Sequence, residues 1–214
     1  MPPQATESRP VVAAFDVDGT LTTRDCVTPF LRRVAGHRLP IALLRHPLRL
    51  ARALLGRDVD ALKALACGAV RGLEAAVLVR EGEAFAQQVH DGWMRSDTMA
   101  RLQRHRALGH RVVLVSASLD TYLAPLGALL GVDGVVCSRL EIGPDGSATG
   151  KLVGANCRGP EKERRLRVWL EREGLTDSEL WAYGDSAGDR ELLGMADHGQ
   201  RVDGVILPVE PADI

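Results

Sequence analysis

The sequence lacks features that mark several classes of protein. Its four cysteines form no Cys-x-x-Cys pair, and no apolar signal region stands near the first residues, so we expect no disulfide-stabilised secreted scaffold. No run of about 18 apolar residues occurs, which argues against an ordinary membrane-spanning helix. The six histidines are scattered and form no His-Glu-x-x-His motif, which argues against zinc. We therefore expect a cytoplasmic protein with reduced thiols.

An excess of one charge is also absent. Lysine and arginine total 27 against 28 aspartates and glutamates, a formal net charge of −1, which argues against bulk binding of nucleic acid. The sequence holds no internal repeats and no low-complexity tract. Its 214 residues are enough for one sizeable core with an inserted lobe. This composition is typical of an ordinary soluble enzyme.

The most informative motif present is Asp16-Val-Asp18-Gly19-Thr20. It follows the apolar run 11–14, so two carboxylates leave the carboxyl end of a predicted buried strand. Open parallel sheets bind ligands outside the carboxyl ends of their strands, and in an extended chain the two aspartates point the same way. The same residues taken alone are also compatible with an Asp-rich turn without chemical function.

Three further segments favour a catalytic site. The apolar strand-like run 111–115 leads into Ser116-Ala117-Ser118, and the run 180–184 leads into Asp185-Ser-Ala-Gly-Asp189. Between them, the segment 156–162 stands at the start of a charged helix and ends in Lys162. This order of motifs resembles the haloacid dehalogenase-like hydrolases, most closely the branch that contains phosphoserine phosphatase. The resemblance covers roughly residues 11–206.

The resemblance and the periodicity together predict an α/β fold, a doubly wound Rossmann-like parallel sheet with an inserted helical cap. Apolar residues at helical spacing indicate the cap over residues 23–97. The core domain is expected over 10–22 and 98–207, with flexible termini at 1–9 and 208–214. Strands are predicted near 11–15, 111–115, 134–138, 180–184 and 202–207, and a β-hairpin over 141–152.

The resemblance implies a magnesium-dependent phosphatase that forms an aspartyl-phosphate. Asp16 is the expected nucleophile, although a role as metal ligand alone stays open. Asp18 is the expected general acid and base, against the alternative of a turn-stabilising residue. Lys162 is expected to neutralise the phosphate and the nucleophile, although it also fits an exposed helical face, and Arg158 is a competing candidate.

The remaining site residues divide into phosphate and metal ligands. Gly19 and Thr20 shape the first loop, and Ser116 offers its hydroxyl beside Ala117, while Ser118 is the candidate N-cap of a helix beginning near Leu119. The oxygen donors of Asp16 and Asp185 suit Mg²⁺, and the resemblance implies the Asp18 carbonyl as a further ligand, with Asp189 as an outer ligand or orienting group.

The substrate is predicted only as a small phosphorylated metabolite. Phosphoserine phosphatase itself is an alternative, but Asp25 and Lys63 replace its usual head-group residues only loosely, since lysine cannot copy a bidentate arginine. A phospholipid head-group phosphatase and a phosphotransferase are further alternatives. The segment 38–56 interleaves arginines with apolar residues, so it allows a membrane contact, which we rank below ordinary cap packing. The oligomeric state is not predicted.

Overall fold

The computed structural model describes residues 9–202, and the elements below refer to that range. In chain order they are β1 (Val11–Phe15), α1 (Val27–Ala35), α2 (Arg38–Leu44), α3 (Pro47–Leu55), α4 (Val59–Cys67), the 3-10 helix η1 (Gly68–Val70), α5 (Ala75–Gly92), α6 (Ser96–Ala107), β2 (Arg111–Leu119), α7 (Asp120–Leu130), β3 (Gly134–Ser138), β4 (Leu140–Ile142), β5 (Ala148–Leu152), α8 (Pro160–Glu173), β6 (Glu179–Gly184), the 3-10 helix η2 (Ala187–Asp189), α9 (Arg190–Met195) and β7 (His198–Arg201).

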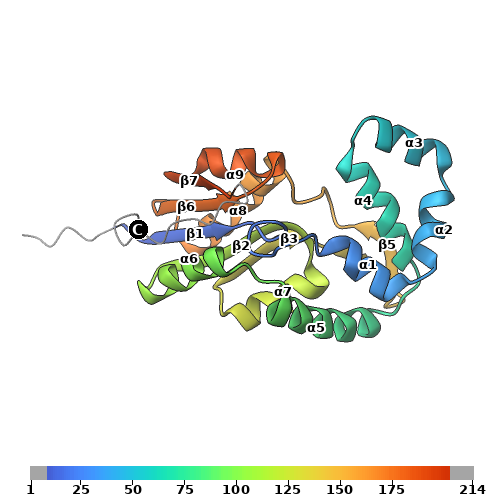
Figure 1. Cartoon of the computed structure of the whole chain (residues 1–214), viewed down its shortest axis with the longest axis horizontal. Coiled ribbons are helices and arrows are strands. Elements are labelled where there is room, and N and C mark those ends of the chain that lie inside the picture. Colours follow the sequence, from blue (N-terminus) through green and yellow to red (C-terminus); the bar gives the residue numbers. More distant parts are fainter. Residues whose placement is uncertain (1–8, 203–214) are drawn as a thin grey trace, which may run out of the picture.

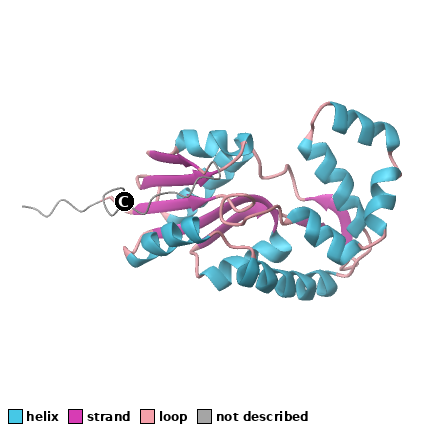
Figure 2. Ribbon diagram, in the orientation of Figure 1, coloured by secondary structure: helices cyan, strands magenta, loops and turns pink. Residues whose placement is uncertain are grey.

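The centre of the molecule is a five-stranded parallel sheet in the order β3-β2-β1-β6-β7. In the middle strand, Ala14 pairs with Val113 on one side and Ala182 on the other. The strand order changes direction at β1, and ligands of such sheets bind at this switch point. Figure 1 shows helices on both faces of the sheet, and Figure 2 separates the strands from the helices by colour. The predicted doubly wound α/β fold is confirmed.

Alternate residues of β1 enter two different cores, because successive side chains of a strand point to opposite faces. Val12 and Ala14 pack in a cluster with α8 and α9. Ala13 and Phe15 pack in the larger cluster that includes residues of α5, α6 and α7. Burial on both faces explains why the strand is a continuous apolar run, and it fixes the backbone from which Asp16 emerges.

Two predicted positions in the sheet need correction. The last strand is β7 at His198–Arg201, whereas the sequence predicts 202–207, of which 203–207 lie outside the described residues. The segment His-Gly-Gln-Arg shows no alternation of apolar and polar residues. Such a pattern is not needed, because backbone pairing to β6 holds this edge strand and most of it is exposed. The second strand runs on through Ser116 to Leu119, beyond the predicted end at 115.

The segment 23–97 is helical as predicted, with α1–α4 grouped at one end of the molecule (Figure 1). Helix α5 lies against α7, where Gly82 allows the contact, because a Cβ at this position would come within 2.1 Å of the Thr121 carbonyl oxygen. The predicted hairpin is present as antiparallel β4 and β5. It bonds to the helical segment, since the Gly72 and Ala75 amides donate to Ala148 and Gly146.

The division into a core domain and a cap domain stays a prediction. Arg9, predicted to lie in a flexible terminus, donates to the carbonyl oxygens of Asp177 and Ser178. The remaining predicted terminal residues, 1–8 and 208–214, lie outside the described residues. Among residues 9–202, none of the helices combines the length and the apolar composition that crossing a bilayer requires.

Candidate active site

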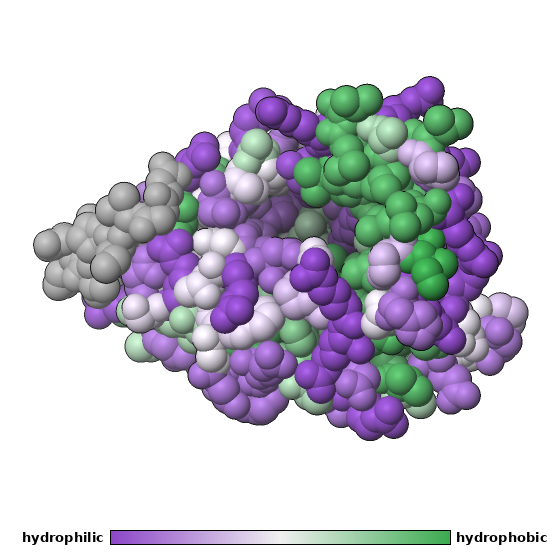
Figure 3. Space-filling view, turned by 45° about the vertical axis from the view of Figure 1, so that its right-hand side comes forward, coloured by the Kyte–Doolittle hydropathy of each residue, from purple (hydrophilic) through white to green (hydrophobic). Residues whose placement is uncertain are grey.

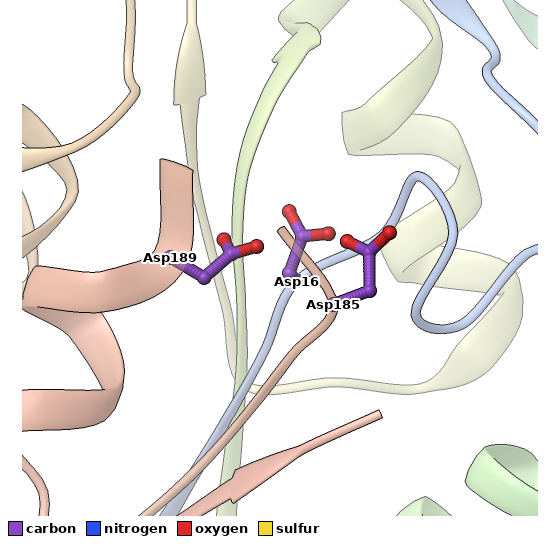
Figure 4. A group of neighbouring side chains, drawn as sticks. All are labelled: Asp16, Asp185 and Asp189. Atoms are coloured by element: carbon purple, nitrogen blue, oxygen red, sulfur yellow. The ribbon is translucent and has the colours of Figure 1, made fainter. Parts of the chain in front are cut away.

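The predicted site residues meet at the carboxyl ends of the three central strands. Asp16 directly follows β1, Asp185 directly follows β6, and Ser116 lies within β2, near its carboxyl end. Asp189 ends η2, one turn after Asp185. Figure 4 shows the carboxylates of Asp16, Asp185 and Asp189 side by side. Each offers an oxygen within 4.8 Å of an oxygen of the other two.

Lys162, on the first turn of α8, is buried among these acids with 2 % of its surface exposed. Its Nζ donates to Asp16 Oδ1 at 2.5 Å and to Asp189 Oδ1. Burial alone lowers the pKa of Lys162, but Asp16 and Asp189 outweigh it and leave the pKa above its usual value. The ammonium therefore stays charged and holds both carboxylates in place.

Asp16 is a buried carboxyl, and burial raises its pKa to about 7 against the opposing effect of Lys162. Thr20 Oγ1 donates to Asp16 Oδ2 at 3.1 Å, so the predicted hydrogen bond within the first loop is confirmed. Thr20 also lies 3.5 Å from Asp185 Oδ1. The nucleophile candidate is thus oriented by two donors, one on each oxygen.

Gly19 makes room for Asp185. Its φ of +85° lies in the left-handed region, as expected for the sharp turn predicted from the sequence. A Cβ at this position would stand 2.3 Å from Asp185 Oδ2. Glycine is therefore needed both for the turn and for the close approach of two loops that are far apart in the sequence.

The donor set at this edge fits a hard divalent cation. The carboxyls of Asp16, Asp185 and Asp189 face one ammonium, Lys162, so ionisation of all three would leave two negative charges uncompensated within the cluster. Burial, and then the charge of Asp189, raises the pKa of Asp185. Both oxygens of Asp189 are already engaged, Oδ1 by Lys162 and Oδ2 by Ser186 N and Oγ at 3.0 and 2.8 Å. Asp189 therefore suits an orienting role better than a direct ligand role.

Asp18 lies beside this cluster and is held separately. Its Oδ1 accepts the Cys26 amide at 2.8 Å, and its Oδ2 accepts Ser118 Oγ at 2.5 Å. Tyr122 in turn donates to Ser118 Oγ at 2.7 Å. Burial raises the pKa of Asp18 above its usual value, against the lowering effect of the Ser118 bond. A raised pKa is what a proton donor near neutral pH requires.

The role of Ser118 as a helix N-cap is wrong. The N-cap of α7 is Leu119, without a side-chain hydrogen bond, and the helix begins at Asp120. The backbone stays extended through Ser118, which turns the hydroxyl towards Asp18 instead of the helix. Ser116 is buried, and its Oγ accepts the Ser118 amide at 3.0 Å.

Residues from α4 and from the loop before α8 complete the opening of the site. Lys63 Nζ donates to the Ala117 carbonyl oxygen and, at 2.6 Å, to Asn156 Oδ1. Asn156 Nδ2 donates to Asp60 Oδ1 at 2.6 Å. Arg158 lines the same pocket as Asp18, while Lys162 occupies the position between the buried carboxylates.

The sequence reasoning missed some of these partners. Tyr122 stands four residues after Ser118, but in isolation it looks like one apolar residue of α7. Asn156 belongs to a segment that the sequence singles out, although nothing in the spacing indicates that Lys63 reaches it from the helical segment. Lys63, expected only as a loose substitute for a head-group arginine, proves to contact the second motif through Ala117.

Comparisons with known proteins show the family of the chain. A family model described as haloacid dehalogenase-like hydrolase matches residues 13–194. Protein CicA of Caulobacter vibrioides (strain NA1000 / CB15N) is 38 % identical over 196 residues, covering 90 % of this chain and 86 % of the relative. The chain belongs to the haloacid dehalogenase-like hydrolases. The predicted membership in the branch resembling phosphoserine phosphatase is confirmed.

Other relatives of this haloacid dehalogenase-like hydrolase are more distant. Phosphoserine phosphatase SerB1 of Mycobacterium tuberculosis (strain ATCC 25618 / H37Rv) is 30 % identical over 86 % of this chain, which spans about 61 % of the length of that relative. A protein of unknown function from Bordetella pertussis Tohama I matches in structure with a TM-score of 0.73 and 25 % identity, covering 87 % of each chain. A phospho-aspartyl intermediate analogue of phosphoserine phosphatase matches with a TM-score of 0.62 and 20 % identity over 88 % of this chain and 84 % of its own, which shows the shared fold.

Proposed function

We propose that the protein hydrolyses a phosphomonoester with the help of Mg²⁺ and through an aspartyl-phosphate on Asp16. As a haloacid dehalogenase-like hydrolase with phosphoserine phosphatases among its relatives, the chain is a phosphoric monoester hydrolase. The observation that carries the mechanism is the pairing of two different carboxyls at the end of β1. Asp16 is held by a buried ammonium, whereas Asp18 is held by neutral donors.

In the first half-reaction, a carboxylate oxygen of Asp16 attacks the phosphorus and the bond to the alcohol oxygen breaks. Asp18 gives its proton to the departing alkoxide, which leaves as the alcohol. In the second, water attacks the phosphorus, Asp18 takes a proton from it, and the bond to Asp16 breaks to release inorganic phosphate. Lys162 keeps Asp16 in position throughout.

The residues that would hold Mg²⁺ are Asp16, Asp185 and the Asp18 carbonyl, with Asp189 oriented behind them. Three clustered carboxylates that exceed the available ammonium charge support this assignment. A bound Mg²⁺ supplies positive charge that offsets the charge of the transferring phosphoryl group. Ser116 and Arg158 are proposed to contact the phosphate oxygens, and the expected cytoplasmic location also stays a prediction.

The test measures phosphate released from O-phosphoserine, glucose 6-phosphate, histidinol phosphate and p-nitrophenyl phosphate in the presence of Mg²⁺. We expect release that chelator abolishes and that Asp16→Asn lowers by at least about 10³-fold. The exposed Asp177, whose carboxylate lies outside the site, gives the matched control Asp177→Asn, which should keep full activity. Full activity in Asp16→Asn would show that the nucleophile assignment is wrong.

A phosphotransferase is separated from a hydrolase in the same assay. Added acceptor alcohols would suppress free phosphate if the group passes to an acceptor other than water. Unchanged phosphate release, together with a phosphoryl group found on the Asp16 peptide after acid quenching, would support hydrolysis through the aspartyl-phosphate.

A further inference from the structure

A pocket of about 710 Å³ opens beside the catalytic acid candidate. Asp18, Ala117 and Arg158 line its end at the sheet. Its other walls come from the four helices α1–α4, and each helix contributes leucine or valine side chains. Figure 3 shows hydrophobic surface gathered beside a hollow in this face of the molecule. The pocket is therefore continuous with the position at which a phosphomonoester would lose its alcohol.

The lining from the helices is apolar and aliphatic. Each of the helices α1 to α4 contributes a leucine, in chain order Leu31, Leu39, Leu50 and Leu62. The lining includes no aromatic ring. A volume of this size is typical of sites for ligands larger than a small polar metabolite. A bound hydrocarbon chain would remove these leucines from contact with water, whereas a serine-sized group would leave most of the leucines in contact with water.

Two charged groups in the pocket wall, Asp25 and Lys63, already bond to the protein. The carboxylate of Asp25 accepts the Val27 and Thr28 amides at 3.2 and 3.0 Å and so holds the first turn of α1. Lys63 is buried and donates to Ala117 and Asn156. An ammonium and a carboxylate on the departing alcohol would have to share Asp25 and Lys63 with these bonds, which disfavours an amino-acid head group.

Arg158 is placed differently. Its guanidinium makes no hydrogen bond or ion pair within residues 9–202, although its charge helps to lower the pKa of Glu191, and it lines the end of the pocket that Asp18 also lines. The pocket thus has one polar end with an available cation and walls of leucine. This polarity matches a molecule with a phosphate at one end and a hydrocarbon chain at the other.

We propose that the pocket between α1 and α4 holds the hydrocarbon chain of the substrate, so that the substrate class is the phosphate monoester of a long aliphatic alcohol or of an acylated glycerol. The inference rests on the proposed phosphatase function and adds its selectivity. Leu54, which lines the outer part of the pocket, is 57 % exposed, so a chain longer than the pocket can leave across α3.

The first arm of the test compares ethyl, butyl, hexyl and octyl phosphate, each below the concentration at which it aggregates. Each methylene buried in the pocket should raise kcat/KM about three- to fourfold, so octyl phosphate should exceed ethyl phosphate by at least about 100-fold. O-phosphoserine is assayed beside them. A flat or falling dependence on chain length, or a preference for O-phosphoserine, would overturn the inference.

The second arm uses two leucines of α3. Leu50 lines the pocket, whereas Leu48 is 85 % exposed and is not part of the lining. Leu50→Trp should fill the pocket and lower the ratio of octyl to ethyl phosphate activity at least about tenfold, and Leu48→Trp should leave that ratio at the wild-type value. Leu54→Trp at the pocket mouth serves as a second pocket variant if Leu50→Trp fails to fold, as judged by circular dichroism. Equal ratios in the pocket variants and the control would contradict the assignment.

The two proposals fail in different ways. No phosphate from any ester, in the presence of Mg²⁺, would overturn the proposed function and the substrate class with it. Phosphate release that depends on Asp16 but not on chain length would leave the function standing and overturn only the selectivity assigned to the pocket.

Discussion

The sheet edge and the helices α1–α4 form two sides of one opening, but they are built from different interactions. At the sheet edge, the oxygens of Asp16 and Asp18 each accept a hydrogen bond from a specific donor. Across the opening, leucine side chains line the pocket, and their apolar contacts do not depend on a precise direction. Directional bonds fix reacting groups to within fractions of an ångström, whereas aliphatic walls accept any chain of suitable shape. Under the proposed function, chemistry and selectivity are therefore expected to change independently.

The largest expected effect on the sheet edge comes from Lys162→Met. The change leaves Asp16 and Asp189 buried without their shared ammonium, so we expect a loss of about 3–5 kcal/mol in the free energy of unfolding. Phosphatase activity should fall by about 10²–10³-fold, since a charge aimed at the transferring group is lost. Urea unfolding and phosphate release measure the two effects. The exposed Lys151, changed to Met, is the control and should show neither.

Lys63→Met tests whether the two sides are coupled. Lys63 crosses from α4 to the Ala117 carbonyl and Asn156, and hydrogen bonds that involve a charged group contribute about 1.5–3 kcal/mol each, net of the bonds to water that they replace. We expect a loss of that order in total and faster amide hydrogen exchange in α4. Hydrogen exchange read by mass spectrometry distinguishes this from a general loss of stability. Unchanged exchange in α4 would mean that the helices are held by apolar packing alone.

The smallest expected effect is on the pH dependence of stability and concerns His105 of α6. Its Nε2 contacts Tyr183 OH and its Nδ1 contacts His110 Nδ1, each at 2.9 Å. Burial, then the charges of His110 and Arg101, lowers the pKa of His105 to about 3. The unfolded chain, with a pKa near 6.5, therefore binds the proton first as pH falls, and folding stability is lost below that pH. At pH 5.5 the loss should be about 1.4 kcal/mol relative to pH 8.

His105→Gln should remove that part of the pH dependence, because glutamine takes up no proton. Urea unfolding of both proteins at pH 8 and pH 5.5 gives the difference, and the titrating groups that do not contact His105 cancel between them. Changing His110 to Gln in both proteins removes the neighbour that does contact it. Equal pH dependence in the two proteins would contradict the assignment of a neutral buried His105.

The sequence predicts the sheet edge better than the pocket, and the reason is physical. Asp16, Asp18 and Asp185 stand at strand ends, and parallel strands bring their ends together whatever lies between them. Lys162 was found from its place in the order of motifs. Its burial could have been suspected, because the chain contains only three lysines among 27 basic residues. The pairing of Ser118 with Asp18 was not predictable, since it depends on the strand continuing past the motif.

The helical segment shows the opposite case. Its helices follow from periodicity, but a periodic leucine that packs in a core cannot be told from one that lines a cavity. Leu31 is buried while Leu54 is exposed, although both line the same pocket. Similarly, the strand expected at 202–207 follows apolar residues, whereas β7 is an edge strand that backbone pairing forms from His-Gly-Gln-Arg.

The contact between Gly19 and Asp185 also limits how this site can change. A Cβ at position 19 would stand 2.3 Å from the Asp185 carboxylate, so any larger residue there requires that carboxylate to move. Residue 19 therefore sets where the Asp185 oxygens can lie. A substitution at position 19 is expected to alter the site through Asp185, although residue 19 itself contributes no reacting group.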